Sequence, residues 1–242
     1  MLRAIQPEHC DFLTGLAIRP LEETGLLLTA RYHPDRFTPE LFHTNGMPLP
    51  LHIARSVPKR QAEFLAGRLL VRHGQEALNL APDTIGTADT RAPIWPKGSS
   101  GSITHARGRC GVLISTDTGS SYGIDTEQIA QGDSLKAILS QTLSDHDKAL
   151  LSKTETARDA TLVFSAKETL FKALHPLIGR FFGFDAAELA EPPGKNTLRL
   201  RLTADLSNTF SKNQPFLIHH ETTDSHILTW LSVSISQTLP VT

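Results

Sequence analysis

The sequence predicts an α+β fold, because segments with helical spacing and segments with strand character alternate along both halves of the chain. Apolar residues recur at helical spacing from Pro58 to about Asn79, which predicts one long helix. Strands are indicated by the apolar run at 111–115 and by the alternation of apolar and basic residues at 198–202. The 242 residues can form one large domain or two smaller ones.

In the first half, a strand is expected at 24–30, before a stretch rich in Pro, His and Gly. The long helix begins at Pro58, because proline suits the first helical position. Prolines and glycines interrupt the segment 84–101, which we interpret as a connection leading to the strand at 111–115. The first half then ends near Thr118.

The second half begins with a strand at 121–124 that leaves a turn. A polar helical stretch at 134–151 and a helix at about 160–175 follow, and Pro176 is expected to end that helix. The remaining strand-like segments are 198–202, 216–220 and 227–236.

Composition argues against several functional classes. Hydrophobic residues make up 39% and charged residues 20% of the chain, and the formal net charge is -1, so no global charge recruits nucleic acid or an anionic membrane. No apolar run approaches the roughly 18 residues that a membrane span needs, and the N-terminus lacks a signal-like apolar region. Cys10 and Cys110 have no metal-ligand or disulfide spacing. We expect a cytoplasmic protein with no membrane or nucleic-acid partner.

Acidic side chains gather in two short segments. Asp125 and Glu127 are two residues apart on a predicted strand, so both point from the same face. Glu168 and Lys172 are four residues apart on a predicted helix and share one side of it. Three carboxylates in one place would repel each other unless a divalent cation lay between them, and oxygen ligands favour Mg²⁺ on a phosphate-containing substrate. The alternative is that these acids are ordinary solvated charges.

The phrases around these acids, with others upstream, carry a resemblance to a known family. They follow one another in the family's order, and they are KRQAEFLAGR at 59–68, PIWPKG at 93–98, GSITH at 101–105, YGIDTE at 122–127 and FSAKETLFKA at 164–173. Together they resemble the Sfp-type 4'-phosphopantetheinyl transferases, in particular the branch of the enterobactin synthase component D enzymes.

A few positions depart from the family pattern, and the changes are conservative. Thr126 replaces the second hydrophobic residue of Gly-Ile-Asp-Ile-Glu, and Thr104 replaces the serine before the histidine. Ala106 also differs, Phe164 stands where many relatives carry Trp, and Thr169 stands where they carry Ser. Because Thr126 would point away from the acids, it affects local packing more than metal binding.

The resemblance implies a fold of two pseudo-symmetric α/β subdomains with the active site between them. An N-terminal subdomain, 1–118, would contact the phosphates and adenine of coenzyme A, and a C-terminal subdomain, 119–242, would carry the metal-binding carboxylates. No close internal repeat is visible in the sequence, so this symmetry rests on the resemblance. Two fused halves would complete the site within one chain, and we expect a monomer.

The activity that the resemblance implies is transfer of 4'-phosphopantetheine from coenzyme A to a serine of an apo carrier protein, with release of adenosine 3',5'-bisphosphate. Asp125, Glu127 and Glu168 would bind Mg²⁺, with Mn²⁺ as an alternative. Lys172, and with it Lys167, would neutralise the leaving group. Glu168 is the candidate general base for the serine, and a metal-bound hydroxide is the alternative.

Further residues are implied to bind coenzyme A. Thr104 and His105 would bind the 3'-phosphate, and Arg91 another phosphate. Arg60 and Arg68 lie on one predicted helix, and both are candidates to bind phosphate, because guanidinium groups suit it. The alternative is that one of the two holds the subdomains together.

The partners that follow from this chemistry are acyl, peptidyl or polyketide carrier proteins, and the sequence does not separate fatty-acid synthesis from siderophore or other nonribosomal peptide synthesis. The segment 128–152 is the candidate docking region, and a helix buried on the core is the alternative interpretation. Two rival functions stay open, namely a Mg²⁺-dependent nucleotide phosphohydrolase and a non-catalytic coenzyme A binding protein.

Overall fold

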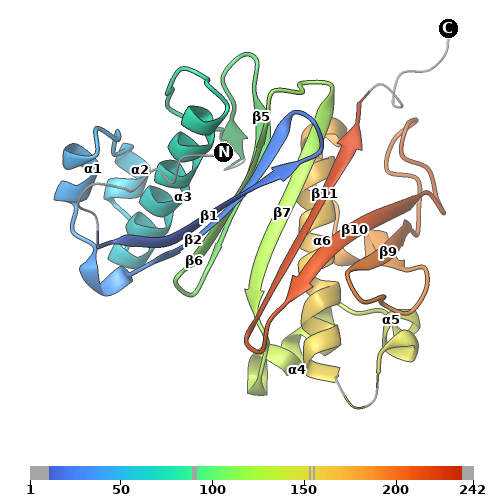
Figure 1. Cartoon of the computed structure of the whole chain (residues 1–242). Coiled ribbons are helices and arrows are strands. Elements are labelled where there is room, and N and C mark those ends of the chain that lie inside the picture. The colour runs from blue at the N-terminus through green and yellow to red at the C-terminus, as the bar shows by residue number, and fades with distance from the viewer. Residues whose placement is uncertain (1–10, 89–91, 153, 155, 236–242) are drawn as a thin grey trace, which may run out of the picture.

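The computed structural model describes residues 11–88, 92–152, 154 and 156–235. The chain forms two lobes, and in each of them a long helix lies on an antiparallel sheet (Figure 1). The N-terminal sheet has the strand order β1-β2-β6-β5 and the C-terminal sheet the order β7-β11-β10-β9-β8. This arrangement confirms the predicted α+β class.

The N-terminal lobe combines its sheet with the long helix α3 and a small hairpin. Its elements are β1 (Leu13–Leu21), β2 (Gly25–Tyr32), η1 (Pro34–Arg36), α1 (Glu40–Thr44), α2 (Leu51–Ala54), α3 (Pro58–Ala77), β3 (Gly86–Thr87), β4 (Pro93–Ile94), β5 (Ser100–Ala106) and β6 (Arg109–Ser115). Helix α3 buries apolar side chains such as Leu65 and Leu70 against Leu28 and Ile114 of the sheet, which closes one core.

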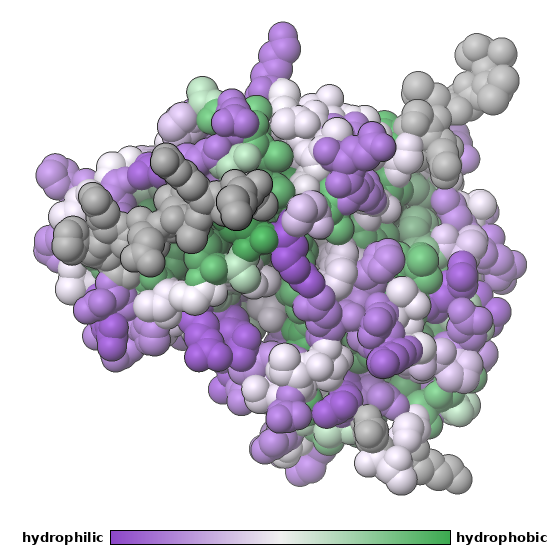
Figure 2. Space-filling model, viewed as in Figure 1, coloured by the Kyte–Doolittle hydropathy of each residue, from purple (hydrophilic) through white to green (hydrophobic). Residues whose placement is uncertain are grey.

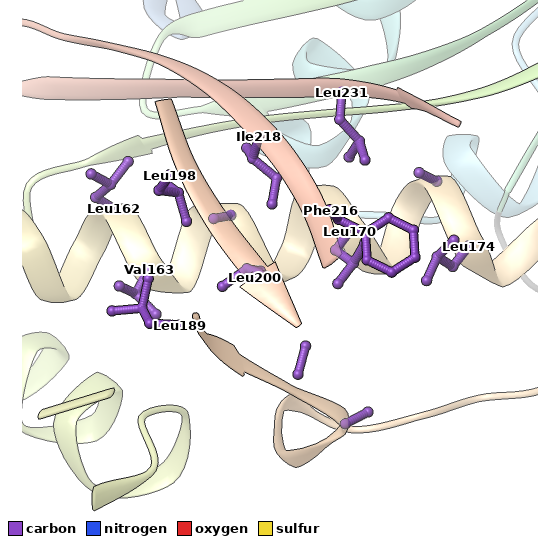
Figure 3. Close-up of a cluster of buried hydrophobic side chains, with 14 of the residues drawn as sticks. Leu162, Val163, Leu170, Leu174, Leu189, Leu198, Leu200, Phe216, Ile218 and Leu231 are labelled. Carbon is purple, nitrogen blue, oxygen red and sulfur yellow. The ribbon is translucent and has the colours of Figure 1, made fainter. Parts of the chain in front are cut away.

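The C-terminal lobe repeats this layout around α6. Its elements are β7 (Ser120–Gln128), α4 (Gly132–Gln141), α5 (Asp145–Leu150), α6 (Thr156–Ile178), η2 (Phe184–Ala186), β8 (Ala187–Leu189), β9 (Thr197–Leu202), β10 (Pro215–Thr222) and β11 (His226–Ser234). Figure 3 shows Leu170 of α6 beside Phe216 of β10, and Leu170 and Leu174 belong to one core cluster with Leu200 and Ile218 of the sheet. Hydrophilic residues cover much of the molecular face in Figure 2.

The two lobes meet where β5 and β7, the edge strands of the two sheets, lie side by side. The hydroxyl oxygens of Ser102 and Thr104 on β5 accept hydrogen bonds from the backbone N–H groups of Ile124 and Thr126 on β7, at 3.3 and 3.1 Å. A small apolar cluster also joins the sheets, with the buried side chains Leu27, Leu113, Tyr122 and Ile124. We call this junction of β5 and β7 the seam.

Several predicted elements need correction. Pro176 lies inside α6, which continues to Ile178; the hydrogen bond lost at proline falls in the last turn, where the loss is small. The stretch 134–151 forms two helices, because Ser144 caps the start of α5. The connection 84–101 contains the β3–β4 hairpin. Strand β7 runs on to Gln128, so the acids lie within the strand.

The chain passes from the first sheet to the second between Ser115 and Ser120. The subdomain boundary at 118 and the roles assigned to the two subdomains stay predictions. Among the described residues, no helix is both long and apolar enough to cross a membrane.

Candidate functional site

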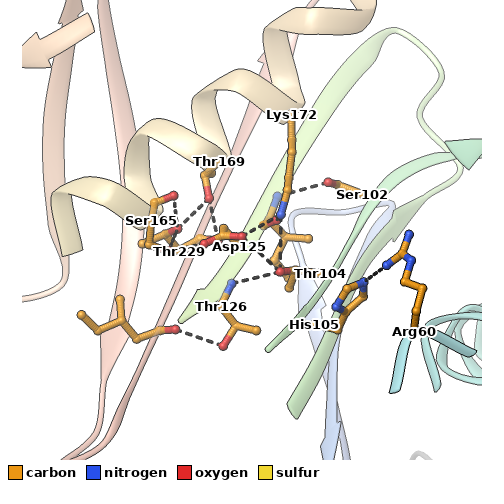
Figure 4. Close-up of polar contacts among 12 residues, drawn as sticks. Arg60, Ser102, Thr104, His105, Asp125, Thr126, Ser165, Thr169, Lys172 and Thr229 are labelled. Carbon is orange, nitrogen blue, oxygen red and sulfur yellow. Dashed lines mark hydrogen bonds and ion pairs between the residues drawn. The ribbon is translucent and has the colours of Figure 1, made fainter. Parts of the chain in front are cut away.

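Asp125 is the centre of a polar cluster at the seam (Figure 4). Its Oδ1 accepts a hydrogen bond from Lys172 Nζ at 2.7 Å and another from the Thr104 hydroxyl at 3.2 Å. The Ser165 hydroxyl donates to Oδ2 at 2.8 Å. The carboxylate is buried at 4% exposure, so these partners from β5 and α6 fix its position and keep its charge compensated.

The close approach of α6 to β7 creates this cluster. A Cβ on Gly123 would lie 2.0 Å from the carbonyl oxygen of Thr169 and 3.2 Å from the Cβ of Ala173, so only glycine fits between strand and helix. Because the helix lies so near, Ser165 and Lys172 reach Asp125 with direct hydrogen bonds.

Two hydroxyl residues that the sequence analysis did not assign to the site support it from behind. Ser165 and Thr229 of β11 have their hydroxyl oxygens 2.9 Å apart, and Thr169 lies 2.6 Å from the same Thr229 oxygen. Ser165 belongs to the FSAKETLFKA phrase, so the sequence could have predicted that it lies near the acidic residues. Thr229 lies in an ordinary strand pattern, and nothing in the sequence around it indicates a place in the site.

Glu127 and Glu168 lie within electrostatic reach of this centre. Burial raises the pKa of Glu127 to about 7, and Asp125 and Glu168 add to the rise while Lys172 opposes it. Burial likewise raises the pKa of Glu168; Lys172 opposes this rise and Asp125 adds to it. The structure thus pairs Asp125 with Lys172 and leaves Glu127 and Glu168 near enough to interact with both electrostatically.

The donor set suits a hard divalent cation. It offers the carboxylate oxygens of Asp125, Glu127 and Glu168, and Mg²⁺ prefers oxygen ligands of this kind. The raised pKa values of Glu127 and Glu168 mean that a bound cation would favour the ionised form of both side chains. In the described part of the chain, no three His, Cys, Asp or Glu side chains already form a group that could hold a metal. In this arrangement Asp125 is paired with Lys172. The metal ligands therefore stay a prediction.

A second polar group lines a pocket in the N-terminal lobe. Arg60 Nη1 of α3 lies 2.9 Å from His105 Nε2 of β5, and Glu63 Oε2 lies 3.6 Å from Nδ1 of the same ring. Burial, with help from Arg60, lowers the pKa of His105 to about 4, so its imidazole is neutral at pH 7. The pocket has a volume of about 680 Å³, and Arg60, Glu63, Arg68 and His105 all line it.

Arg68 contributes to that pocket while it ties α3 to the β3–β4 region. Its Nε donates to the carbonyl oxygen of Ile85 at 3.1 Å, and its Nη2 to the hydroxyl of Thr87 at 3.1 Å. Its guanidinium lies over the ring of Phe64 at 4.3 Å. Burial and the neighbouring Arg60 lower its pKa to about 10. These contacts are all made inside the N-terminal lobe.

Other predicted residues are not brought to these groups. Lys167 is buried, with Nζ 2.7 Å from Asp147 Oδ2 and 3.0 Å from the carbonyl oxygen of Thr142. Thr104 faces Asp125 while His105, the next residue of the strand, faces Arg60, so the two do not converge on one phosphate. Arg91 lies outside the described residues.

Comparison with known proteins gives two family matches, one in each lobe. Residues 50–115 match the 4'-phosphopantetheinyl transferase N-terminal domain, and residues 121–230 match the 4'-phosphopantetheinyl transferase superfamily. The chain belongs to the 4'-phosphopantetheinyl transferase superfamily. The boundary between the two matches falls in the passage from β6 to β7, and all the acidic site residues lie in the second.

Curated relatives are similar over a large part of their length. The chain is 36% identical over 156 residues to 4'-phosphopantetheinyl transferase Svp of Streptomyces mobaraensis, covering 62% of this chain and 63% of that protein. It is 35% identical over 141 residues to 4'-phosphopantetheinyl transferase PptT of Mycobacterium tuberculosis, covering 57% and 61%. Enterobactin synthase component D of Salmonella typhi is 30% identical over 164 residues, covering 66% and 68%. The matches to Svp and PptT thus span a little over three fifths of those proteins.

Proposed function

We propose that this family member transfers the 4'-phosphopantetheine group of coenzyme A to a serine of an apo acyl or peptidyl carrier protein and releases adenosine 3',5'-bisphosphate. The observation that carries the proposal is the charged group at the seam, where Lys172 is paired with Asp125 and both interact electrostatically with Glu127 and Glu168, near a pocket lined by basic groups. Phosphoryl transfer needs charge neutralisation and alignment above all, and this arrangement supplies both.

The donor would lie in the pocket of about 680 Å³ in the N-terminal lobe. Arg60 and Arg68 supply permanent positive charge for its phosphates. The neutral imidazole of His105 can donate one hydrogen bond to a phosphate oxygen, and an arriving anion would raise its pKa. This assignment gives residues 1–118 the contacts with coenzyme A, including the role predicted for Arg91.

Asp125, Glu127 and Glu168 would hold Mg²⁺, or Mn²⁺, which supplies Lewis-acid neutralisation of the pyrophosphate when bound. Lys172, whose ammonium already lies at the seam, would stabilise negative charge on the leaving phosphate. Lys167 lies behind this group and would act through the position of α6.

The serine hydroxyl must lose its proton as it attacks. Glu168 is the candidate base, because its raised pKa brings it nearer to the working pH and so makes its carboxylate a stronger base than an ordinary glutamate. Glu168 thus has two possible duties, metal ligand and base, and its substitution tests them together.

Intact-protein mass spectrometry tests the reaction. An apo carrier protein incubated with this protein, coenzyme A and Mg²⁺ should gain ~340 Da, the mass of one phosphopantetheine arm, and EDTA should abolish the gain. Phosphate release without an acceptor would indicate a nucleotide phosphohydrolase. Binding of coenzyme A without either product would indicate a non-catalytic binding protein.

The cellular setting follows from the substrates. Acyl, peptidyl and polyketide carriers are compared in the same assay, which separates a role in fatty-acid synthesis from one in siderophore or other peptide synthesis. A cytoplasmic monomer accords with a coenzyme A substrate, with the free, buried thiol of Cys110 and with a site completed by two lobes of one chain.

A further inference from the structure

A pocket of about 390 Å³ lies on the face of β7 opposite the acidic residues. Thr126 lines it, whereas Asp125 and Glu127 point to the other face, because successive side chains of a strand alternate. The pocket of about 680 Å³ proposed for coenzyme A, the donor pocket, shares no lining residue with it. The charged and imidazole side chains that line the 390 Å³ pocket come from both lobes and are Arg31, Arg109, Glu221 and His226. We call it the basic pocket.

Two arginines from the N-terminal lobe lie side by side in the basic pocket. Arg31 of β2 and Arg109 of β6 are directly opposed in the ladder, and like charges in such positions destabilise a sheet. Burial lowers the pKa of Arg109, and the neighbouring Arg31 lowers it further. In the described part of the chain, neither side chain has a hydrogen bond or an ion pair. An anion bound to both would therefore relieve the repulsion and supply acceptors for their N–H groups.

The acid that lines the basic pocket is engaged by another arginine. Glu221 of β10 forms an ion pair with Arg19 of β1. The guanidinium of Arg19 also lies over the ring of Trp230, 5.5 Å from its centroid, which holds this pair on its side of the pocket. Counted together, Arg19, Arg31 and Arg109 stand against Glu221, so two positive charges are left without an acidic partner.

His226 adds an imidazole to the basic pocket. The turn before it is fixed by hydrogen bonds from the Thr223 N–H to the His226 carbonyl oxygen, at 2.8 Å, and from the His226 N–H to the Thr223 hydroxyl, at 3.0 Å. Its Nδ1 lies 2.9 Å from the Ser225 hydroxyl oxygen, and its buried Nε2 has no partner among the described residues. Burial lowers the pKa of His226, and Arg109 and Arg31 lower it further. The ring therefore senses the charge of both arginines.

We propose that the basic pocket is a phosphate-binding site in which the guanidinium groups of Arg31 and Arg109 hold one phosphate group. Guanidinium groups suit phosphate, because their N–H groups match its oxygens in pairs and their charge is permanent. A pocket of about 390 Å³ has room for free phosphate or for the phosphate of a small ester. Because β7 separates this site from the acidic residues, a ligand here does not compete for the catalytic centre.

Nuclear magnetic resonance of the histidine rings in the whole protein tests the site. The His226 signal is assigned with His226→Gln, and inorganic phosphate is then added at constant pH and constant ionic strength, balanced with chloride. The wild-type signal should move and saturate, with half-saturation at roughly 1–10 mM phosphate. The pKa of His226 should rise when phosphate is bound, because the anion offsets the two arginines that lower it.

Variants locate the binding. The double substitution Arg31→Thr with Arg109→Thr removes both guanidinium groups and should weaken the response at least about tenfold. Arg199→Thr is the matched control, because Arg199 is a surface arginine of β9 paired with Glu191. Arg60→Gln removes an arginine of the donor pocket. Both of these should keep the wild-type response of His226, and the double variant should keep at least the wild-type urea midpoint, because it loses an opposed like-charge pair.

The same titration with adenosine 5'-monophosphate identifies the source of the phosphate group. Tighter binding of the nucleotide than of inorganic phosphate would indicate a phosphate ester as the ligand. Equal binding would show that the phosphate group alone is recognised, and weaker binding would indicate free phosphate. Each of these results supports the site.

Two results would overturn the inference. The first is a His226 signal that stays in place, or drifts without saturation to the same extent in the wild type and the double variant. The second is a response that disappears in Arg60→Gln, which would assign the bound phosphate to the donor pocket. The measurement needs no transfer of phosphopantetheine, so its outcome is independent of the proposed function.

Discussion

Replacing Lys167 with Met tests whether this lysine of the family phrase is structural or catalytic. Its ammonium is 2.7 Å from Asp147 Oδ2, and the two side chains are 2% and 0% exposed. Asp147 also accepts the backbone N–H groups of Ser144, which caps α5, and of Leu189 on β8. The pair therefore joins α6, α5 and β8 inside the C-terminal lobe, and we expect its loss to destabilise that lobe.

The magnitude follows from the burial of the remaining charge. Removing one partner of a buried ion pair costs about 3–5 kcal/mol, because the other charge is left without compensation. Asp147 keeps its two backbone hydrogen bonds, so the lower end, about 3 kcal/mol, is expected for Lys167→Met. In a domain of this size, that loss lowers the melting temperature by roughly 6–12 °C.

Urea denaturation followed by circular dichroism measures the free energy of unfolding. Lys136→Met is the control, since Lys136 forms an ion pair with Asp133 in which both side chains are largely exposed, and its loss should leave the midpoint almost unchanged. If Lys167→Met unfolds at the wild-type urea concentration but abolishes transfer, Lys167 acts on substrate and the structural reasoning is refuted.

The remaining predictions concern the seam. Glu168→Gln should lower kcat by at least about 10²-fold with little change in the affinity for coenzyme A measured by calorimetry, and equal losses in both would count against a general base. Gly123→Ala should destabilise the protein by about 3 kcal/mol in urea, because the new Cβ would meet the Thr169 carbonyl oxygen at 2.0 Å; an unchanged midpoint would contradict the close packing. The pKa of Glu127 is raised from 4.5 to about 7 in the folded protein. As the pH rises through this range in EDTA, Glu127 loses its proton in the unfolded chain before it does so in the folded protein, so the free energy of unfolding of the wild type should fall. Glu127→Gln should remove that fall, and identical pH profiles of the two proteins would disprove it.

The long helices were predictable because their apolar spacing is strong over many turns. Helix α3 was expected from Pro58 to about Asn79 and runs to Ala77. Strand β1 was missed, since it alternates half-buried and exposed side chains at the edge of its sheet and carries little apolar signal. The predicted end of α6 before Pro176 was wrong, because the helix tolerates this proline in its final turn.

The acidic residues of the site were predictable for a local reason. Two-residue spacing on a strand and four-residue spacing on a helix fix which side chains share a face, whatever the rest of the fold does. Contacts between distant segments had no such signal. Lys167 faces Asp147 on α5, and Thr229 reaches Ser165 from a strand more than sixty residues later in the sequence. Long-range pairing of this kind depends on the tertiary fold.

The seam explains why a hydroxyl is required where the family pattern has serine and this chain has Thr104. The Thr104 oxygen accepts the N–H of Thr126 at 3.1 Å, which aligns β5 with β7, and its proton is directed at Asp125 Oδ1 at 3.2 Å. Lys172 contacts the same oxygen at 3.4 Å. One side chain therefore sets the alignment of the lobes and the orientation of the central carboxylate. Because Thr and Ser both supply this oxygen, the exchange preserves the junction, whereas a side chain without it would disturb the lobes and the acidic site together.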